Sequence, residues 1–142
     1  MQNISYDKVN QLRHVRYFGN ADGLRAYMEK HKAILAPKFD LVVNTLNEKM
    51  GDLDILSWNV PNGGYFVSVY TPDGCAKRVV ELCKEAGVVL TGAGATYPYK
   101  NDPADNNIRL SPSFPTLEDL GKALELFCIS VKLAAAEKLL SE

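Results

Sequence analysis

The sequence predicts an α+β fold in which helices pack against one small antiparallel or mixed sheet. Two helical patterns open the chain, short β-rich and helical stretches alternate after them, and a long helix with an apolar stripe follows. The predicted order of elements is α-α-β-β-α-β-β-α. With 142 residues, the chain is long enough to bury a real core.

The first two elements are predicted helices. Residues 7–19 carry apolar residues at helical spacing and close at Gly19, a residue that favours a helix end. The second pattern runs to Gly51, with Asn20 and Asp22 as candidate N-terminal caps.

Pro37 lies inside the second predicted helix. A proline has no backbone N–H, and its ring clashes with the preceding helical turn. We therefore expect this helix to kink or divide near Ala36.

Four short stretches rich in β-branched and aromatic residues are predicted strands. They are residues 54–60, 65–70, 88–90 and the segment around Arg109. The Pro-Asn-Gly-Gly sequence at 61–64 is typical of a turn, because its glycines tolerate positive φ.

Two more helices complete the pattern. Residues 71–87 are predicted to be helical, with Thr71 as the cap and Gly87 as the stop. The last helix is predicted to begin at Thr116, and Asp119 three residues later forms a near capping box.

Composition excludes several classes of function. The 16 Lys and Arg residues nearly balance 17 Asp and Glu residues, which does not favour a nucleic-acid or membrane partner. No run is apolar and long enough to span a bilayer, and the first residues contain no signal-peptide core, so we expect a cytoplasmic protein. The three cysteines fit neither a disulfide framework nor a zinc site.

No catalytic or metal-binding constellation stands out in the sequence. His14 and His31 lie in helical stretches without a carboxylate or cysteine at ligand spacing. The glycine- and alanine-rich stretch 92–96 lacks the spacing of a phosphate-binding loop. We interpret it as a loop that bends sharply or lies close to another surface.

Arg109 is the sharpest candidate for a functional residue. Strand alternation places it on the opposite face from Ile108 and Leu110. A guanidinium can hold a carboxylate or phosphate in a two-pronged grip. The pattern alone favours a solvated arginine on an outer strand face, whereas the long loop before it favours a site.

Three strings, PNGGYFVSVY, VVLTGAGATYP and NNIRLSPSFPTLEDLGKALE, occur in this order. Together they resemble the C-terminal small domain of fold-type I, pyridoxal-phosphate-dependent aminotransferases, in the bacterial aspartate-aminotransferase-like or class I/II branch. Residues 1–20 resemble the helical segment that leaves the large domain of such enzymes, and residues 21–142 resemble the small domain.

The resemblance implies an enzyme that transfers an amino group between an α-amino acid and a 2-oxo acid, as a homodimer with pyridoxal phosphate. Within it, Arg109 would bind the α-carboxylate of the substrate, and Asn62 and Tyr97 would line the mouth of the site. No Schiff-base lysine motif is visible, and the nearest match, residues 130–132, lies deep in the last helix. We therefore expect no catalytic residue and no bound cofactor in this chain, and no activity without the large domain.

A second reading is a non-catalytic amino-acid-binding or regulatory module derived from the aminotransferase fold. Aminotransferase-like domains also occur fused to DNA-binding segments in transcriptional regulators. No basic patch or helix-turn-helix pattern is visible in these residues, so no nucleic-acid partner is expected.

Overall fold

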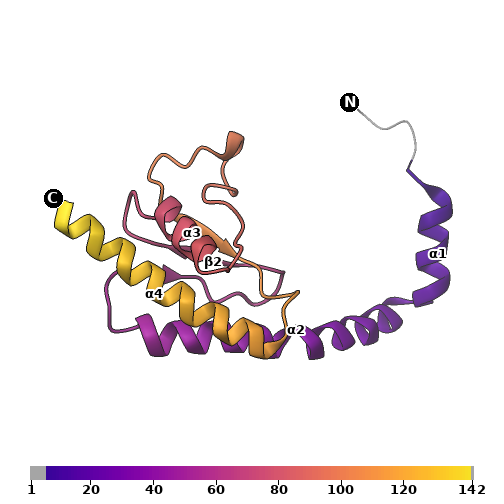
Figure 1. Ribbon diagram of the computed structural model, residues 1–142. Coiled ribbons are helices and arrows are strands. Elements are labelled where there is room, and N and C mark those ends of the chain that lie inside the picture. Colours follow the sequence, from indigo (N-terminus) through magenta and orange to yellow (C-terminus); the bar gives the residue numbers. More distant parts are fainter. Residues whose placement is uncertain (1–5, 142) are drawn as a thin grey trace. The chain divides into compact units, whose positions relative to one another are not determined.

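The computed structural model describes residues 6–141 and has the predicted α+β class (Figure 1). The observed elements follow the predicted order apart from the strand expected at 88–90. They are α1 (Lys8–Phe18), α2 (Ala21–Met50), β1 (Ser57–Trp58), β2 (Val67–Tyr70), α3 (Ala76–Glu85), the short 3-10 helix η1 (Pro98–Lys100), β3 (Asn107–Leu110) and α4 (Leu117–Ser141). The chain divides into two compact units, Met1–Ala36 and Pro37–Glu142. None of the described helices is both long enough and apolar enough to cross a membrane.

The first unit contains α1 and the beginning of α2. The carboxylate of Asp7 caps α1 by accepting a hydrogen bond from the backbone N–H of Asn10, and Gly19 ends the helix at φ 70°. Asn20 caps α2 as predicted, because its side-chain oxygen accepts a hydrogen bond from the N–H of Gly23 at 2.9 Å. These local contacts explain why both helix starts could be read from the sequence.

Pro37 does not divide α2, so that part of the prediction is wrong. The helix continues to Met50 because its second half buries Val42, Leu46 and Met50 in the core, which stabilises it beyond the missing hydrogen bond. The boundary between the two units nevertheless falls between Ala36 and Pro37. The predicted boundary at residue 20 concerns the exit from a large domain and stays a prediction.

The second unit is built on a three-stranded antiparallel sheet in the order β1-β2-β3. The register pairs Val69 with Ile108 and Ser68 with Arg109. Paired residues point to the same face of a sheet, so the buried Val69 and Ile108 lie on the face that joins the core. The opposite face, here called the polar face, carries Ser68, Tyr70, Asn107 and Arg109.

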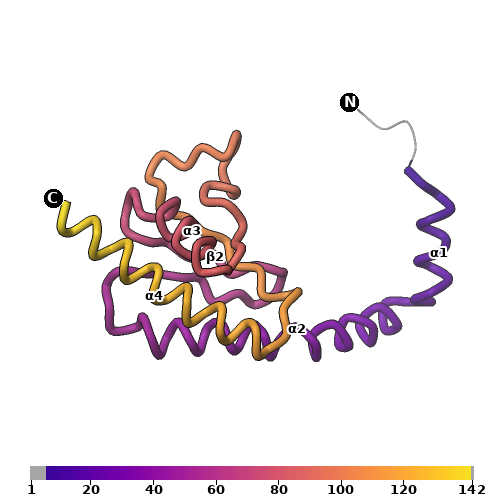
Figure 2. Tube along the Cα trace, viewed as in Figure 1, coloured from indigo at the N-terminus to yellow at the C-terminus, as the bar shows by residue number. Residues whose placement is uncertain are grey.

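The core of the second unit lies between the apolar face of the sheet and three helices. It contains buried side chains from the second half of α2, from β2 and β3, from α3 and from α4. Figure 2 shows the long segment between α3 and β3 extending away from α2 and α4. The helices therefore pack against the apolar face of the sheet. The loop contacts the polar face.

Two local predictions need correction. Residues 88–90 have no regular secondary structure, and Val89 is 86% exposed, whereas Val88 and Leu90 pack against the core. Thr71 does not cap α3, which begins at Ala76. The hydroxyl of Thr71 is instead turned toward the backbone oxygen of Asn106 at 3.3 Å, a contact distant in sequence that no local pattern predicts.

Candidate functional site

Arg109 projects from the central residues of β3 onto the polar face. Its guanidinium carbon lies 4.2 Å from the ring centroid of Phe66, the distance of a cation–π contact. Its Nε is buried and has no hydrogen-bond partner among the described residues. A buried N–H without an acceptor is costly, which makes Arg109 the leading candidate for a binding residue.

Asn107, two residues earlier on the same face, is the centre of a polar network. It is only 3% exposed. Its amide nitrogen lies 2.9 Å from the hydroxyl oxygen of Ser68 and 3.3 Å from the backbone oxygen of Val69. Its side-chain oxygen lies 2.6 Å from the hydroxyl oxygen of Thr96. Asn107 therefore connects the glycine- and alanine-rich loop to β2 beside Arg109.

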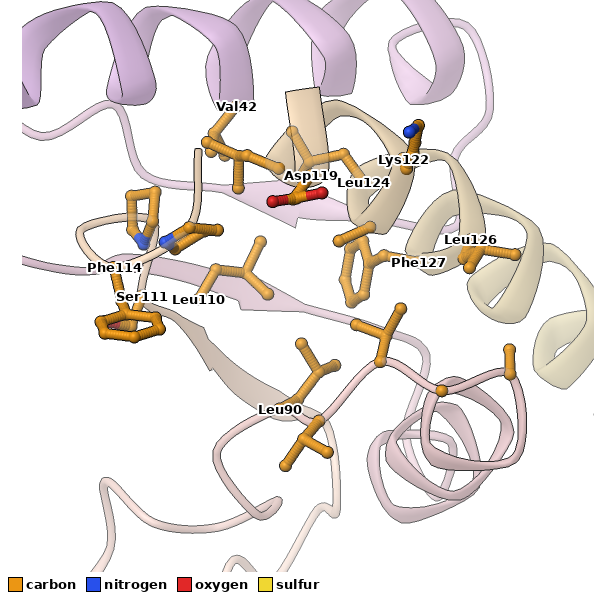
Figure 3. A pocket seen from close by; sticks show the side chains of 18 residues that line it. Val42, Leu90, Leu110, Ser111, Phe114, Asp119, Lys122, Leu124, Leu126 and Phe127 are labelled. Atoms are coloured by element: carbon orange, nitrogen blue, oxygen red, sulfur yellow. The ribbon is translucent and has the colours of Figure 1, made fainter. Parts of the chain in front are cut away.

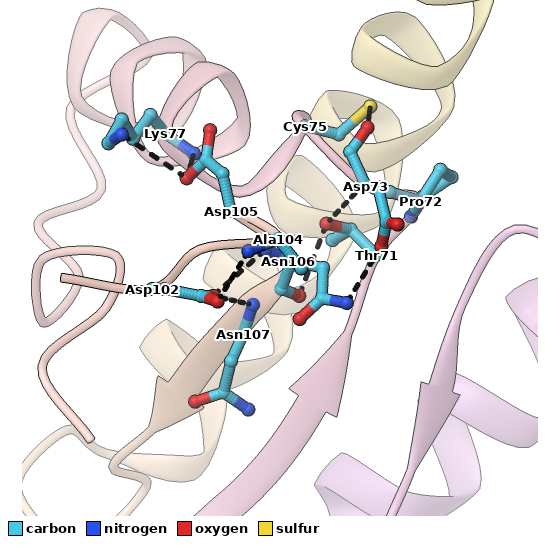
Figure 4. Close-up of polar contacts among 10 residues, drawn as sticks. All are labelled: Thr71, Pro72, Asp73, Cys75, Lys77, Asp102, Ala104, Asp105, Asn106 and Asn107. Carbon is cyan, nitrogen blue, oxygen red and sulfur yellow. Dashed lines mark hydrogen bonds and ion pairs between the residues drawn. The ribbon is translucent and has the colours of Figure 1, made fainter. Parts of the chain in front are cut away.

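Asp102 organises the backbone just before β3 (Figure 4). Its carboxylate accepts hydrogen bonds from the backbone N–H groups of Ala104 at 3.1 Å and of Asn106 and Asn107 at 3.0 Å each. Burial alone would raise the pKa of this carboxyl, but the backbone N–H donors together outweigh burial and leave the pKa below its ordinary value. The negative charge thus fixes the start of the strand that carries Arg109.

Gly94 brings the loop close to the segment before β3. It has φ +73°, and a Cβ atom built on it would lie 2.9 Å from the backbone oxygen of Lys100. Its N–H points to the backbone oxygen of Asn107 at 3.4 Å. The interpretation of residues 92–96 as a loop lying close to another surface is confirmed at this residue.

Asn62 and Tyr97 are both exposed residues. Asn62 lies in the turn that precedes β2, and Tyr97 directly precedes η1 with 37% of its surface exposed. Within residues 6–141, neither side chain makes a hydrogen bond or ring contact. Their role at the mouth of the site stays a prediction.

Sequence reasoning missed the polar network around Asn107, two residues before Arg109 on β3. Asp102, Asn107, Ser68 and Thr96 come from three separate segments, and only tertiary contacts bring them together. One signal was available, since asparagine is depleted in strands and Asn107 begins one.

The cysteines and histidines form no second site in the described chain. Burial raises the pKa of the Cys83 and Cys128 thiols, which makes them poor nucleophiles. His14 and His31 belong to an aromatic cluster in the first unit. No group of His, Cys, Asp and Glu among the described residues could hold a metal ion.

An apolar pocket of about 570 Å³ lies elsewhere in the second unit (Figure 3). Its lining comes from α2, from residues 86–90, from the segment after β3 and from α4, and includes Leu90, Phe114 and Phe127. Arg109 is not among the lining residues. The charged side chains at its rim already have partners, Asp119 with Thr116 and Lys122 with Glu118. This pocket supplies no reactive group.

Fold and site together define a helix-supported antiparallel sheet whose arginine, Arg109, has no hydrogen-bond or ion-pair partner among residues 6–141. The chain belongs to the aspartate amino-transferase family, whose model matches residues 1–142. It corresponds to a C-terminal portion of a fold-type I aminotransferase.

Two comparisons with Corynebacterium glutamicum proteins support this assignment. The chain is 50% identical over 137 residues to an aspartate aminotransferase, covering 96% of this chain and 32% of that protein. It also matches the crystal structure of an aspartate transaminase with a TM-score of 0.90 at 50% identity, covering 96% of this chain and 32% of the other. The chain thus spans about a third of the length of the relatives it matches.

A more distant structure shows the same fold. The alpha-aminoadipate aminotransferase LysN from Thermus thermophilus, complexed with N-(5'-phosphopyridoxyl)-L-leucine, matches with a TM-score of 0.69 at 20% identity. The match covers 80% of this chain and 28% of LysN. At this identity, the likeness concerns the fold alone.

Proposed function

We propose that this chain supplies the carboxylate-binding half of a pyridoxal-phosphate-dependent aminotransferase. The enzyme transfers an amino group between an α-amino acid and a 2-oxo acid, and Arg109 binds the α-carboxylate that both substrates share. The observation that carries the proposal is the buried Nε of Arg109, which has no partner among the described residues.

The surroundings of Arg109 suit this role. The ring of Phe66 supports the guanidinium from one side at 4.2 Å, which restricts the plane in which its N–H groups point. A planar fork of N–H donors then matches a carboxylate with two parallel, charge-assisted hydrogen bonds. Such a pair fixes the orientation of the substrate as well as its position. Asn62 and Tyr97 complete the proposal as residues at the mouth of the site.

In this proposal the complete enzyme, and not this chain alone, binds the cofactor. Pyridoxal phosphate, which the family implies, supplies the electron sink when it is bound. The lysine of the stretch 130–132 does not fit a covalent role toward it, because Lys132 is exposed on α4 while Ser130 and Val131 are buried. Arg109 suits a role toward the carboxylate of the substrate. The chain alone is not expected to catalyse transamination.

Assembly and location extend the same proposal. We infer a homodimer in the cytoplasm, in which a large domain completes the site. This chain spans only about a third of the relatives it matches, which leaves room for such a domain. The reading as a regulatory module is not favoured, because the matching family and the 50% identical relative are aminotransferases.

A chimeric enzyme tests the role of Arg109. This chain would replace the matching third of the Corynebacterium glutamicum aspartate aminotransferase, and transamination would be measured with and without Arg109→Ala. We expect the substitution to lower kcat/KM, because it removes a charge-assisted carboxylate contact. The corresponding loss of transition-state binding free energy should be about 2–5 kcal/mol.

Two further variants sharpen this test. Arg109→Lys keeps the charge but loses the planar fork, so it should recover only part of the activity. Arg25→Ala removes an exposed arginine whose ion-pair partner within residues 6–141 is Asp22, and it should leave kcat/KM unchanged. An Arg109→Ala chimera as active as its parent would remove Arg109 from the mechanism.

A further inference from the structure

Ser68 is the residue directly opposite Arg109 in the β2–β3 register. Residues paired in this way have Cβ atoms about 4.5–5.5 Å apart and point to the same face of the sheet. Ser68 and the base of the Arg109 side chain are therefore neighbours on the polar face. Ser68 and Arg109 are both half-buried, so neither residue is closed off from solvent.

The direction of the hydrogen bond between Asn107 and Ser68 is fixed by a third group. The nitrogen and oxygen ends of an asparagine amide are told apart by their partners. One end of the Asn107 amide lies 3.3 Å from the backbone oxygen of Val69, which can only accept. That end must be the NH₂ group, and the same NH₂ group lies 2.9 Å from the Ser68 oxygen.

The other end of the amide confirms this orientation. The Asn107 side-chain oxygen can only accept, and the Thr96 hydroxyl lies 2.6 Å from it. Thr96 therefore donates to Asn107, and Asn107 donates to Ser68. Both hydrogen bonds are therefore donated in the same direction, from Thr96 in the loop to Asn107 and from Asn107 to Ser68 on β2.

The hydroxyl of Ser68 consequently has a proton to donate. Its oxygen already accepts from Asn107, and within residues 6–141 no group accepts a hydrogen bond from it. The neighbouring guanidinium cannot accept one either, since arginine has only donors. A carboxylate held by Arg109 offers acceptor sites in excess of the two that the guanidinium fork uses.

We propose that Ser68 donates a second hydrogen bond to the carboxylate bound by Arg109. This inference rests on the proposed function of Arg109 and adds a residue that discriminates between ligands. The site then presents the N–H donors of the guanidinium together with the hydroxyl proton. A carboxylate has two charged acceptor oxygens for these donors, whereas a carboxamide has one uncharged oxygen and an NH₂ group that the guanidinium cannot accept from, so the site favours the carboxylate.

Titration of the 142-residue chain tests this selection. The probes are succinate, a dicarboxylate, and succinamide, its uncharged diamide of similar shape. Chemical-shift changes in the ¹⁵N spectrum, read at Ser68 and at the Arg109 side chain, give the Kd. The unaltered chain should bind succinate in a saturable manner and succinamide much more weakly.

Three substitutions at Ser68 isolate the hydroxyl. Ser68→Ala should weaken succinate binding by about tenfold, because it removes one hydrogen bond to a charged group. Ser68→Cys, a variant of nearly the same size with a weak donor, should weaken it similarly and replaces Ser68→Ala if that variant does not fold. Ser68→Thr keeps the hydroxyl and suits a strand, so it should restore affinity. The dispersion of each spectrum verifies folding.

Arg109→Ala separates the two proposals. If Arg109→Ala abolishes succinate binding and Ser68→Ala leaves it unchanged, the role of Ser68 is wrong and that of Arg109 stands. If Arg109→Ala leaves binding unchanged, the proposed function fails, and the inference fails with it. The same holds if the unaltered chain does not bind succinate.

Discussion

At the scale of single residues, the site depends on polar groups whose partners are distant in sequence. Strand alternation correctly placed Arg109 on the face opposite Ile108, because that depends only on the period of a strand. Its contact with Phe66 and the network centred on Asn107 could not be read in the same way. They depend on how a loop and two strands meet, which no local pattern contains.

Asp102 provides a pH-dependent prediction at this scale. The pKa of the Asp102 carboxyl is lowered in the folded chain. The ionised carboxylate therefore stabilises the fold fully above its unfolded pKa of about 4. This stabilisation is lost as the pH falls through the folded pKa. Asp102→Asn cannot accept all three backbone N–H groups, and at pH 7 it should lower the free energy of unfolding by about 1–3 kcal/mol. It should also remove this part of the decline in stability below about pH 4.

Urea unfolding at pH 7 and in the acid range measures both effects. Asp40→Asn is the matched control, since Asp40 is exposed and has no hydrogen-bond or ion-pair partner among the described residues. It should retain the stability and the pH dependence of the unaltered chain. An Asp102→Asn variant with the same acid profile as the parent would show that the carboxylate does not stabilise the start of β3.

At the scale of elements, the sequence was accurate where local contacts decide the structure. The cap at Thr116 is confirmed, because the Thr116 hydroxyl accepts from the N–H of Asp119 at 3.1 Å within one turn of α4. The cap at Thr71 and the strand at 88–90 were wrong, because a strand requires a partner and Thr71 found a distant one. The secondary-structure propensity of a segment depends on its own residues and does not show which distant segments will pair with it.

The loop between α3 and β3 gives a prediction with its own control. Gly94→Ala places a side chain at φ +73° and within 2.9 Å of a backbone oxygen, so it should destabilise the loop by about 1–2 kcal/mol or more. Gly92→Ala lies two residues earlier, has no atom within 4 Å of the added Cβ and has no positive φ. It should be close to neutral.

Amide hydrogen exchange at residues 92–107 measures this difference. Faster exchange in Gly94→Ala and unchanged exchange in Gly92→Ala are expected. Equal protection in the two variants would contradict the close approach of this loop to the segment before β3.

At the scale of the whole molecule, the buried core lies entirely within the unit Pro37–Glu142. Its members come from the second half of α2, from the sheet and from α3 and α4. Several apolar residues of the other unit are more than half exposed, among them Val9, Leu12 and Val15 on α1. The stability of the chain should therefore reside in residues 37–142.

Removing residues 1–36 tests this division. The shortened chain should retain a cooperative unfolding transition in urea, because it keeps every member of the core. Phe127→Ala in the full chain is the contrasting variant, since Phe127 is 1% exposed and its loss should cost about 3–5 kcal/mol. Loss of cooperative unfolding on removing residues 1–36 would show that the first unit is needed for the fold.

The sequence by itself determined the α+β class, the existence of the helices with the caps at Asn20 and Thr116, the face of β3 on which Arg109 lies, and the resemblance to an aminotransferase family. Each of these depends on periodicity, on contacts within one helical turn, or on strings of residues in order. Only the tertiary structure decided that α2 continues past Pro37, that residues 88–90 form no strand, and that Asn107, Thr96 and Ser68 meet beside Arg109. The physical reason is that burial and hydrogen bonding between distant segments outweigh local preferences, and a linear pattern does not contain those distances.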